Sequence, residues 1–284
     1  MFGGKRTYER ICRYLARETD SVVVFVDYRL APEHQHPAQL SDCLSAIMYF
    51  MENATVYGVD ANCIVLVGDS SGGTLVSGIS RELLKKRHVP KIQAQILMYP
   101  FLQVLNLSLP SHQQNRFGPG LTMNRIMKLA FMYLNLEPSN FDDLLRRAHV
   151  PENRAMATQK WFSADCIPET FKARGYEPPL PLPFSKTLSE KVRMDDESLR
   201  SPIEDEDAVV QQLPKTYILT CEYDVFRDDG LLFKKRLEDS GVPVTWNHLQ
   251  DGFHGCLLFI DIWLMECSCT KLACEDIVNF IKGL

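Results

Sequence analysis

A serine set among glycines constrains the fold of this chain more than any other feature. The sequence G-D-S-S-G-G at residues 68–73 follows directly after a short apolar run at residues 63–67. A serine with glycine two positions before it and two positions after it, at the end of a β-branched run, is the pattern of a nucleophile elbow. A strand must turn sharply into a helix there, and neighbouring side chains would collide. We therefore predict a strand, a tight turn at Ser70, and a helix over residues 74–86.

This pattern is weak on its own because chance supplies it often. A tight turn that merely holds a buried serine is the structural alternative. The choice between the two depends on whether the rest of the chain supplies the partners that a nucleophilic serine needs.

Strand and helix patterns alternate before and after the turn. Strands are predicted where β-branched residues run together, and helices where apolar residues recur at spacings of three and four. The run at residues 21–28 is continuous, which suits a strand buried on both faces of a parallel sheet. The alternation predicts right-handed βαβ units. The elements are helices at residues 7–17 and 39–51, and strands at residues 21–28, 63–67 and 92–99.

The segment at residues 101–213 breaks the alternation. An irregular insertion of this size is usually functional or mobile rather than core, so we predict a cap or lid over the site. A stripe of methionine and aromatic side chains between residues 123 and 133 indicates core packing more than a lining for a ligand groove. The segment contains helical patterns at 123–136 and 141–148, a proline-rich piece at 167–184 and an acidic run at 195–207.

The alternation resumes after this segment. Residues 255–266 are strongly apolar, but two acids interrupt them, so they predict a buried helix rather than a membrane span. The other elements are strands at residues 215–220 and 244–248, a loop at 251–255, and helices at 229–240 and 270–281.

Composition limits the classes of function. A chain of 284 residues with 45% apolar content fits one large α/β domain over residues 1–284 better than two small ones. The net charge is −5 and no basic cluster is present, so nucleic-acid binding is not expected. The nine cysteines include no C-x-x-C pair, so we expect core residues or free thiols, no metal and no cofactor. The chain has no apolar run of about 18 residues that would predict a membrane span or a secretory signal.

Two further side chains give Ser70 the partners that nucleophilic chemistry needs. Asp224 and His254 each follow the carboxyl end of a predicted strand, where ligands bind in open α/β sheets. The order serine, acid, histidine is the chain order of the α/β-hydrolase triad. His254 would act as general base, and Asp224 would orient its ring and stabilise its charged form. The backbone N–H of Ser71 would donate to the oxyanion.

Other acids and histidines fit these roles less well. Asp228, Asp229 and Asp251 suit helix starts or turns. His248 lies within a predicted strand. The remaining histidines lack a loop position after a strand together with flanking glycines; they are His34, His36, His88, His112 and His149.

Four motifs occur in order along the chain. They are Y-R-L-A-P-E-H at residues 28–34 with P-A at 37–38, G-D-S-S-G-G at 68–73, E-Y-D at 222–224 with R-D-D-G at 227–230, and D-G-F-H-G at 251–255. Together they make the chain, from about Gly3 to its C-terminus, resemble the hormone-sensitive-lipase-like esterases and, within them, the arylacetamide deacetylase-like proteins. The resemblance implies an α/β-hydrolase fold with a mostly parallel sheet, flanking helices and a helical cap at about residues 101–213.

The resemblance also implies an activity and a location. It implies a carboxylesterase, lipase or deacetylase that cleaves acyl esters or arylamides of hydrophobic small molecules or lipids. For location, the resemblance implies a protein of the endoplasmic-reticulum membrane whose catalytic domain lies on the lumenal side. Membrane association would then depend on an N-terminal anchor that is not present in this chain.

One family motif is not found in the sequence. The family carries His-Gly-Gly-Gly on the loop after its third strand, where backbone N–H groups form most of the oxyanion hole; we expect it just upstream of Phe2. Without it, only the N–H of Ser71 remains as a donor, and loss of one donor typically costs about 2.7–4 kcal/mol. Without the third strand, the strands at 21–28 and 63–67 would pair directly or leave a gap. We therefore expect a chain truncated at its N-terminus.

Two functional hypotheses follow. The first is a serine esterase that uses Ser70, Asp224 and His254. The second is a catalytically silent α/β-hydrolase-like protein that binds a lipid or a partner, because the oxyanion loop is absent. A peptidase on the same fold is a third possibility that no sequence feature singles out.

Overall fold

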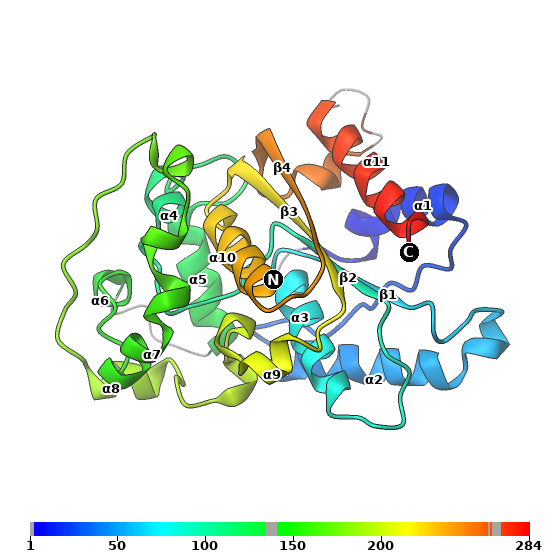
Figure 1. The fold of residues 1–284 in the computed structure, drawn as a ribbon, viewed down its shortest axis with the longest axis horizontal. Coiled ribbons are helices and arrows are strands. Elements are labelled where there is room, and N and C mark those ends of the chain that lie inside the picture. Colours follow the sequence, from blue (N-terminus) through cyan, green and yellow to red (C-terminus); the bar gives the residue numbers. More distant parts are fainter. Residues whose placement is uncertain (1–2, 135–140, 261, 263–267) are drawn as a thin grey trace.

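Four parallel strands form the centre of the structure, a computed structural model that describes residues 3–134, 141–260, 262 and 268–284 (Figure 1). The strands are β1 (Val65–Asp69), β2 (Ala94–Met98), β3 (Lys215–Tyr223) and β4 (Val244–Phe253), and they lie side by side in chain order. Each neighbouring pair is parallel. The side chains of β2 are all buried, as expected for an apolar strand with a helical layer on each face.

Two terminal helices cover one face of the sheet. Ile11 of α1 (Lys5–Thr19) packs in one cluster with Ile96 of β2, Leu219 of β3 and the apolar face of α11 (Ser268–Lys282). Figure 1 shows α1 and α11 side by side. The helices predicted at residues 7–17 and 270–281 are thus confirmed.

Two central helices cover the other face. Leu97 and Ile218, which point away from the first cluster, pack with apolar residues of α3 (Ser71–Leu84) and α10 (Arg227–Asp239). A further helix, α2 (Ala38–Glu52), packs against α3. The predicted helices at residues 39–51, 74–86 and 229–240 are confirmed, and the predicted parallel sheet between two helical layers is confirmed with them.

The strand predicted at residues 21–28 is wrong. This segment is extended, but it belongs to no strand of the described chain. Val22 is 55% and Val24 is 51% exposed, whereas Val26 and Tyr28 pack against the cluster that contains α2 and α3. A β-branched run becomes a buried strand only when another strand takes its hydrogen bonds. Within the described residues β1 pairs only with β2, so β1 is the sheet edge on this side.

Short helices make up the irregular segment at residues 101–213, which lies beside the sheet (Figure 1). The predicted stripe contributes to packing: Met123 and Met127 are buried in a cluster with Phe226 at the start of α10. Of the predicted helix at 123–136, the last two residues lie outside the described chain. The role of the segment as a cap stays a prediction. Besides short 3₁₀ turns, the described part of the segment contains the α-helices α4 (Pro110–Gln114), α5 (Met123–Leu134), α6 (Phe141–Leu145), α7 (Glu152–Phe162), α8 (Lys186–Lys191) and α9 (Asp207–Val210).

Two C-terminal elements differ from their predictions. The strand β4 continues to Phe253, so the loop predicted from residue 251 begins later. The buried helix predicted at residues 255–266 is a single 3₁₀ turn at Cys256–Phe259, and residues 261 and 263–267 lie outside the described chain. No disulfide joins any two of the described cysteines; Cys267 is not among them. Within the described residues no helix is long and apolar enough to cross a membrane.

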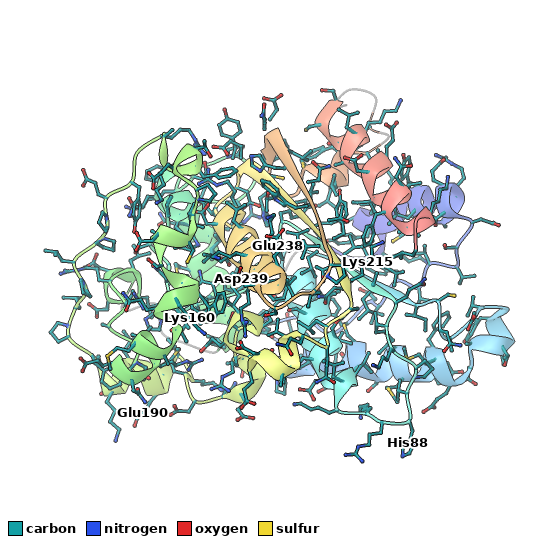
Figure 2. The ribbon with its side chains drawn as sticks, viewed as in Figure 1. His88, Lys160, Glu190, Lys215, Glu238 and Asp239 are labelled. Carbon is teal, nitrogen blue, oxygen red and sulfur yellow. The ribbon has the colours of Figure 1, made fainter. Side chains whose placement is uncertain are left out.

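A buried arginine ties the irregular segment to the sheet layers. Arg236 of α10 is 2% exposed and donates to the carbonyl oxygens of Ile203 at 3.2 Å and Asp205 at 2.8 Å. Its guanidinium lies 4.4 Å from the ring centre of Trp161 on α7. In Figure 2, Lys160 of α7 and the end of α10 lie in the same region.

We expect Arg236→Met to lower the free energy of unfolding by about 2–4 kcal/mol, because two buried carbonyls lose their donor. Lys235→Met on the exposed side of the same helix is the control and changes it by about 0.5 kcal/mol or less. Urea unfolding of the two variants gives the comparison. Equal effects would show that Arg236 does not anchor the segment.

Candidate active site

The turn at Ser70 has the backbone conformation of a nucleophile elbow. Ser70 lies between β1 and α3 with φ 54° and ψ −121°, outside the regions that side-chain-bearing residues usually adopt. Its N–H donates to the carbonyl of Met98 at 2.9 Å. Its carbonyl accepts from the N–H groups of Gly73 at 3.0 Å and Phe101 at 3.3 Å. These three bonds hold the strained residue in place.

The steric need for glycine falls on two positions of the motif. A Cβ at Gly68 would lie 2.3 Å from the carbonyl oxygen of Gly72, and a Cβ at Gly73 would lie 2.7 Å from Cβ of Pro100. A Cβ at Gly72 would meet only a side-chain oxygen of Asp69, at an ordinary 3.7 Å. The strand and helix approach so closely that Gly68 is required, whereas Gly72 is not.

The structure brings the three residues singled out in the sequence together. Ser70 Oγ lies 2.8 Å from Nε2 of His254, and Nδ1 of His254 lies 2.9 Å from Oδ2 of Asp224. The second carboxylate oxygen of Asp224 accepts from the backbone N–H of Phe226 at 3.0 Å. With Nδ1–H donating to Asp224, the neutral ring of His254 presents Nε2 as an acceptor for the Ser70 hydroxyl.

The surroundings of His254 favour its protonated form. Burial disfavours the imidazolium, but the charge of Asp224 and its hydrogen bond outweigh burial, so the pKa of His254 is raised above its ordinary value. Tyr99 and Phe226 pack edge-on against the imidazole, with ring centres 5.1 and 5.3 Å away. The two aromatic contacts and the two hydrogen bonds together fix the orientation of the imidazole ring.

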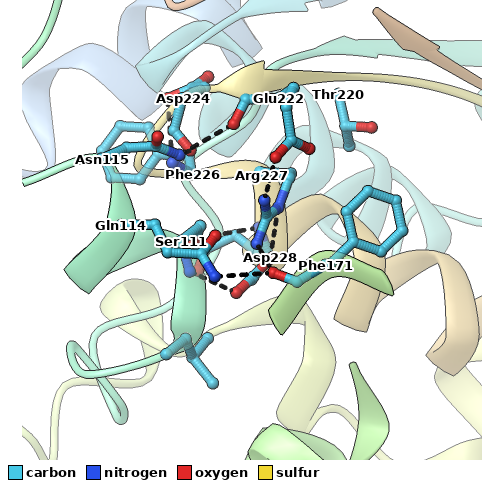
Figure 3. Close-up of polar contacts among 12 residues, drawn as sticks. Ser111, Gln114, Asn115, Phe171, Thr220, Glu222, Asp224, Phe226, Arg227 and Asp228 are labelled. Atoms are coloured by element: carbon cyan, nitrogen blue, oxygen red, sulfur yellow. Dashed lines mark hydrogen bonds and ion pairs between the residues drawn. The ribbon is translucent and has the colours of Figure 1, made fainter. Parts of the chain in front are cut away.

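A polar network holds the turn that carries Asp224 (Figure 3). Asn115, the residue after α4, donates to the carbonyl of Asp224 at 2.8 Å and to that of Glu222 at 3.0 Å. The fully buried Arg227 forms ion pairs with Asp228 at 2.9 Å and with Glu222 at 3.0 Å. No sequence pattern pointed to Asn115, because it lies about a hundred residues from Asp224, in the irregular segment.

The same network continues into the irregular segment. Arg227 donates to the carbonyl of Phe171 at 2.8 Å, and Gln114 donates to the same oxygen at 2.9 Å. Ser111 donates its hydroxyl to the carbonyl of Val225, one residue beyond Asp224, at 2.7 Å. The irregular segment is thus bonded directly to the turn that presents the acid (Figure 3).

The rival acids occupy other positions. Asp228 accepts from the N–H of Ser111 at 2.7 Å, and Asp229 accepts from the N–H of Leu102 at 3.0 Å. Burial raises the pKa of Asp229 to about 7, although hydrogen bonds from Gln103 and Leu102 oppose the shift. Both lie in the first turn of α10 as predicted, whereas Asp251 is exposed on β4.

Four of the rival histidines have structural partners outside the triad: His36, His112, His149 and His248. His112 and His149 are buried, and burial lowers their pKa values to about 3 and about 4. His36 contacts the hydroxyl of Tyr133 at 2.7 Å, and His248 lies 3.3 Å from Glu222.

Ser71 is the first residue of α3. Backbone N–H groups in the first turn of a helix have no helical acceptor, and they carry the positive end of the helix dipole. The N–H of Ser71 is one of these groups, and it directly follows Ser70 in the chain. Among the described residues, no group of three or more potential ligands could hold a metal ion.

Comparisons with known proteins show the family to which the chain is related. A family model described as an alpha/beta hydrolase fold matches residues 1–160 and 183–258. Arylacetamide deacetylase-like 4 from Homo sapiens is 41% identical over 286 residues, which cover 100% of this chain and 70% of that protein. Neutral cholesterol ester hydrolase 1 from Bos taurus is 33% identical over 259 residues, 89% of this chain and 64% of that protein.

Comparison with solved structures also supports the fold. The crystal structure of carboxyl esterase 2 from the fungus Tuber melanosporum has a TM-score of 0.71 and 25% sequence identity, and the match covers 100% of this chain and 74% of that one. The fold class predicted from the sequence is confirmed.

We expect Gly68→Ala to lower the free energy of unfolding by about 2 kcal/mol or more, because the new methyl group meets rigid backbone. Gly72→Ala is the matched control, and its cost should be below about 1 kcal/mol. Thermal unfolding of both variants tests this difference. A Gly72→Ala variant that is the less stable of the two would contradict the geometry of the turn.

Proposed function

Because the chain belongs to the alpha/beta hydrolase family, with arylacetamide deacetylase-like proteins among its relatives, we propose that it is a serine hydrolase acting on carboxylic esters or arylamides. The observation that carries the proposal is the continuous line of hydrogen bonds from Ser70 through His254 to Asp224. The names of two relatives, arylacetamide deacetylase from Rattus norvegicus and neutral cholesterol ester hydrolase 1 from Bos taurus, support hydrolysis of arylamides or carboxylic esters.

The first half of the reaction forms an acyl-enzyme. Nε2 of His254 takes the hydroxyl proton of Ser70 while Oγ attacks the substrate carbonyl carbon. The resulting imidazolium is stabilised by Asp224, and the oxyanion is stabilised by the N–H of Ser71. His254 then gives the proton to the leaving alcohol or amine, and the acyl group stays on Ser70.

The second half of the reaction hydrolyses the acyl-enzyme and regenerates the free enzyme. A water molecule gives a proton to His254 and attacks the acyl carbon, and the tetrahedral species again places its negative charge near Ser71. Collapse of this species returns the proton to Ser70 Oγ and releases the carboxylic acid.

Aromatic side chains beside the triad favour a hydrophobic substrate. Phe101, which donates its N–H to Ser70, packs against Phe226 with ring centres 4.9 Å apart, and Phe226 contacts His254. An apolar acyl or alcohol group near Ser70 would bury surface against these rings. We infer that the substrates are esters or amides of hydrophobic small molecules or lipids.

A second candidate function is binding without catalysis. The observation that favours it is that Ser71 is the one oxyanion donor assigned within the described residues. A site with a single donor would stabilise the oxyanion less well by about 2.7–4 kcal/mol per missing donor. A folded chain that binds hydrophobic esters without turnover would support this candidate.

Ser70→Ala should lower the hydrolysis rate of p-nitrophenyl butyrate by at least about 10³-fold, because the nucleophile is gone. Ser21→Ala, at an exposed serine far from the elbow in sequence, serves as the control and should keep the wild-type rate. Circular dichroism of each protein separates loss of chemistry from loss of fold. Equal rates for wild type and Ser70→Ala would overturn the proposal.

The rate should also depend on pH in a defined direction. The neutral form of His254 is the base, and its pKa is raised, so kcat/KM falls as the pH drops through a value above about 6.5.

Asp224→Asn should lower kcat by about 10⁴-fold, whereas Asp251→Asn should not change it. A pH profile without an acid limb, or equal effects of the two substitutions, would exclude the assigned roles.

A further inference from the structure

A short loop of the irregular segment contacts the backbone beside the acid and the backbone of the histidine. The loop contains the sequence G-P-G at residues 118–120 and lies between α4 and α5. It begins at Asn115, whose side chain donates to the carbonyl of Asp224 (Figure 3). The carbonyl of Asn115 in turn accepts from the N–H of Gly118 at 2.8 Å. The loop is thus attached to the turn that carries the acid.

The first glycine of the loop lies close to the residue before Asp224. A Cβ at Gly118 would lie 3.1 Å from the carbonyl oxygen of Asn115 and 3.4 Å from that of Tyr223. Both distances are at the short end of the range that Cβ atoms adopt in proteins. Tyr223 is the last residue of β3 and directly precedes Asp224. The loop therefore passes the acid turn in close backbone contact.

The second glycine lies against His254 itself. Gly120 has φ 77°, and a Cβ there would lie 2.4 Å from the carbonyl oxygen of His254 and 3.3 Å from Cδ2 of Phe253. Cβ atoms essentially never come within 3.0 Å of such atoms, so alanine at this position must displace one of the two backbones by about 0.6 Å or more. Position 120 is therefore restricted by its left-handed conformation and by its contact with the histidine.

The ladder between β3 and β4 is irregular where this loop meets it. Cys221 pairs with Leu249, but Tyr223 pairs with Phe253, so β4 has two more residues than β3 between these pairs. A bulge of this kind leaves strand residues unpaired and lets the strand bend. The acid and the histidine directly follow the second pair. The ladder alone therefore constrains their separation less than a regular pair of strands would.

We propose that the G-P-G loop at residues 118–120 is a spacer between the acid turn and the backbone of His254, and that Gly120 is a positioning residue for His254. The ring of Pro119 fixes one backbone dihedral between the two glycines, so their two contacts stay at a set separation. The spacer thereby holds the imidazole in line with its carboxylate partner. This inference deepens the proposed function and rests on it. It gives the irregular segment a role at the base as well as at the acid.

A matched glycine separates positioning from backbone strain. Gly241, after α10, has φ 78°, and a Cβ there would meet no atom within 4 Å. Alanine brings the same left-handed strain at positions 120 and 241, and this strain lowers stability at both. Only at position 120 does the new methyl group also push against the histidine. The difference between the two variants therefore isolates the contact with His254.

The experiment observes His254 directly and then measures the rate. In the ¹H NMR spectrum of the full chain, the proton between Nδ1 of His254 and Asp224 gives a strongly deshielded signal, assigned by its loss in His254→Gln. We expect Gly120→Ala to shift or abolish this signal. It should also lower kcat for p-nitrophenyl butyrate by about 10–100-fold with little change in KM, because misplacement by about 1 Å can cost about 10²-fold. Gly241→Ala should keep the wild-type signal and kcat.

Two outcomes overturn the proposal. One is a folded Gly120→Ala variant with the wild-type signal and kcat. The other is an equal change in Gly120→Ala and Gly241→Ala, which would assign the effect to backbone strain.

A second variant covers the case in which Gly120→Ala does not fold. Pro119→Gly adds no atom and frees the loop, so the signal should broaden or shift and kcat should fall by about 3–10-fold. An unchanged signal and rate in this variant overturn the proposal. Absence of ester turnover in wild type argues against the proposed function, whereas the signal still tests the position of His254 in that protein.

Discussion

The hydrogen bond between Nδ1 of His254 and Oδ2 of Asp224 is the interaction on which the rest of the site depends. It joins the ends of β3 and β4, fixes the tautomer of the imidazole, and thereby makes Nε2 an acceptor for Ser70. If this bond is lost, the elbow still presents a serine, but the serine has no base. The sheet places these residues together because parallel strands end at the same edge.

The irregular segment contributes to the site through backbone contacts. Asn115 and Ser111 donate hydrogen bonds to backbone carbonyls of the turn that carries Asp224. In the opposite direction, Arg227 donates a hydrogen bond to the carbonyl of Phe171 in the irregular segment. Such bonds fix the direction in which the carboxylate points, and buried networks of this kind are costly to break. The segment therefore helps to position Asp224, independently of its predicted role as a cap.

The sequence predicted those parts of the structure that local chemistry determines. The turn at Ser70 depends on residues within a few positions of it, and the spacing of apolar residues was enough to place α1, α3 and α10. Residues 21–28 were assigned wrongly because their conformation depends on a neighbouring strand, which composition cannot supply. Asn115 could not be found from the sequence, because it meets the site from a distant part of the chain with an ordinary side chain.

Covalent labelling shows whether Ser70 is a nucleophile that His254 activates. The folded chain is treated with a fluorophosphonate, and the added mass is measured on the intact protein and located by peptide mapping. We expect a single label on Ser70, no label on Ser70→Ala, and much slower labelling of His254→Gln. Labelling of Ser70→Ala to the same extent as wild type, or no labelling of the folded wild-type chain, would contradict this role of Ser70.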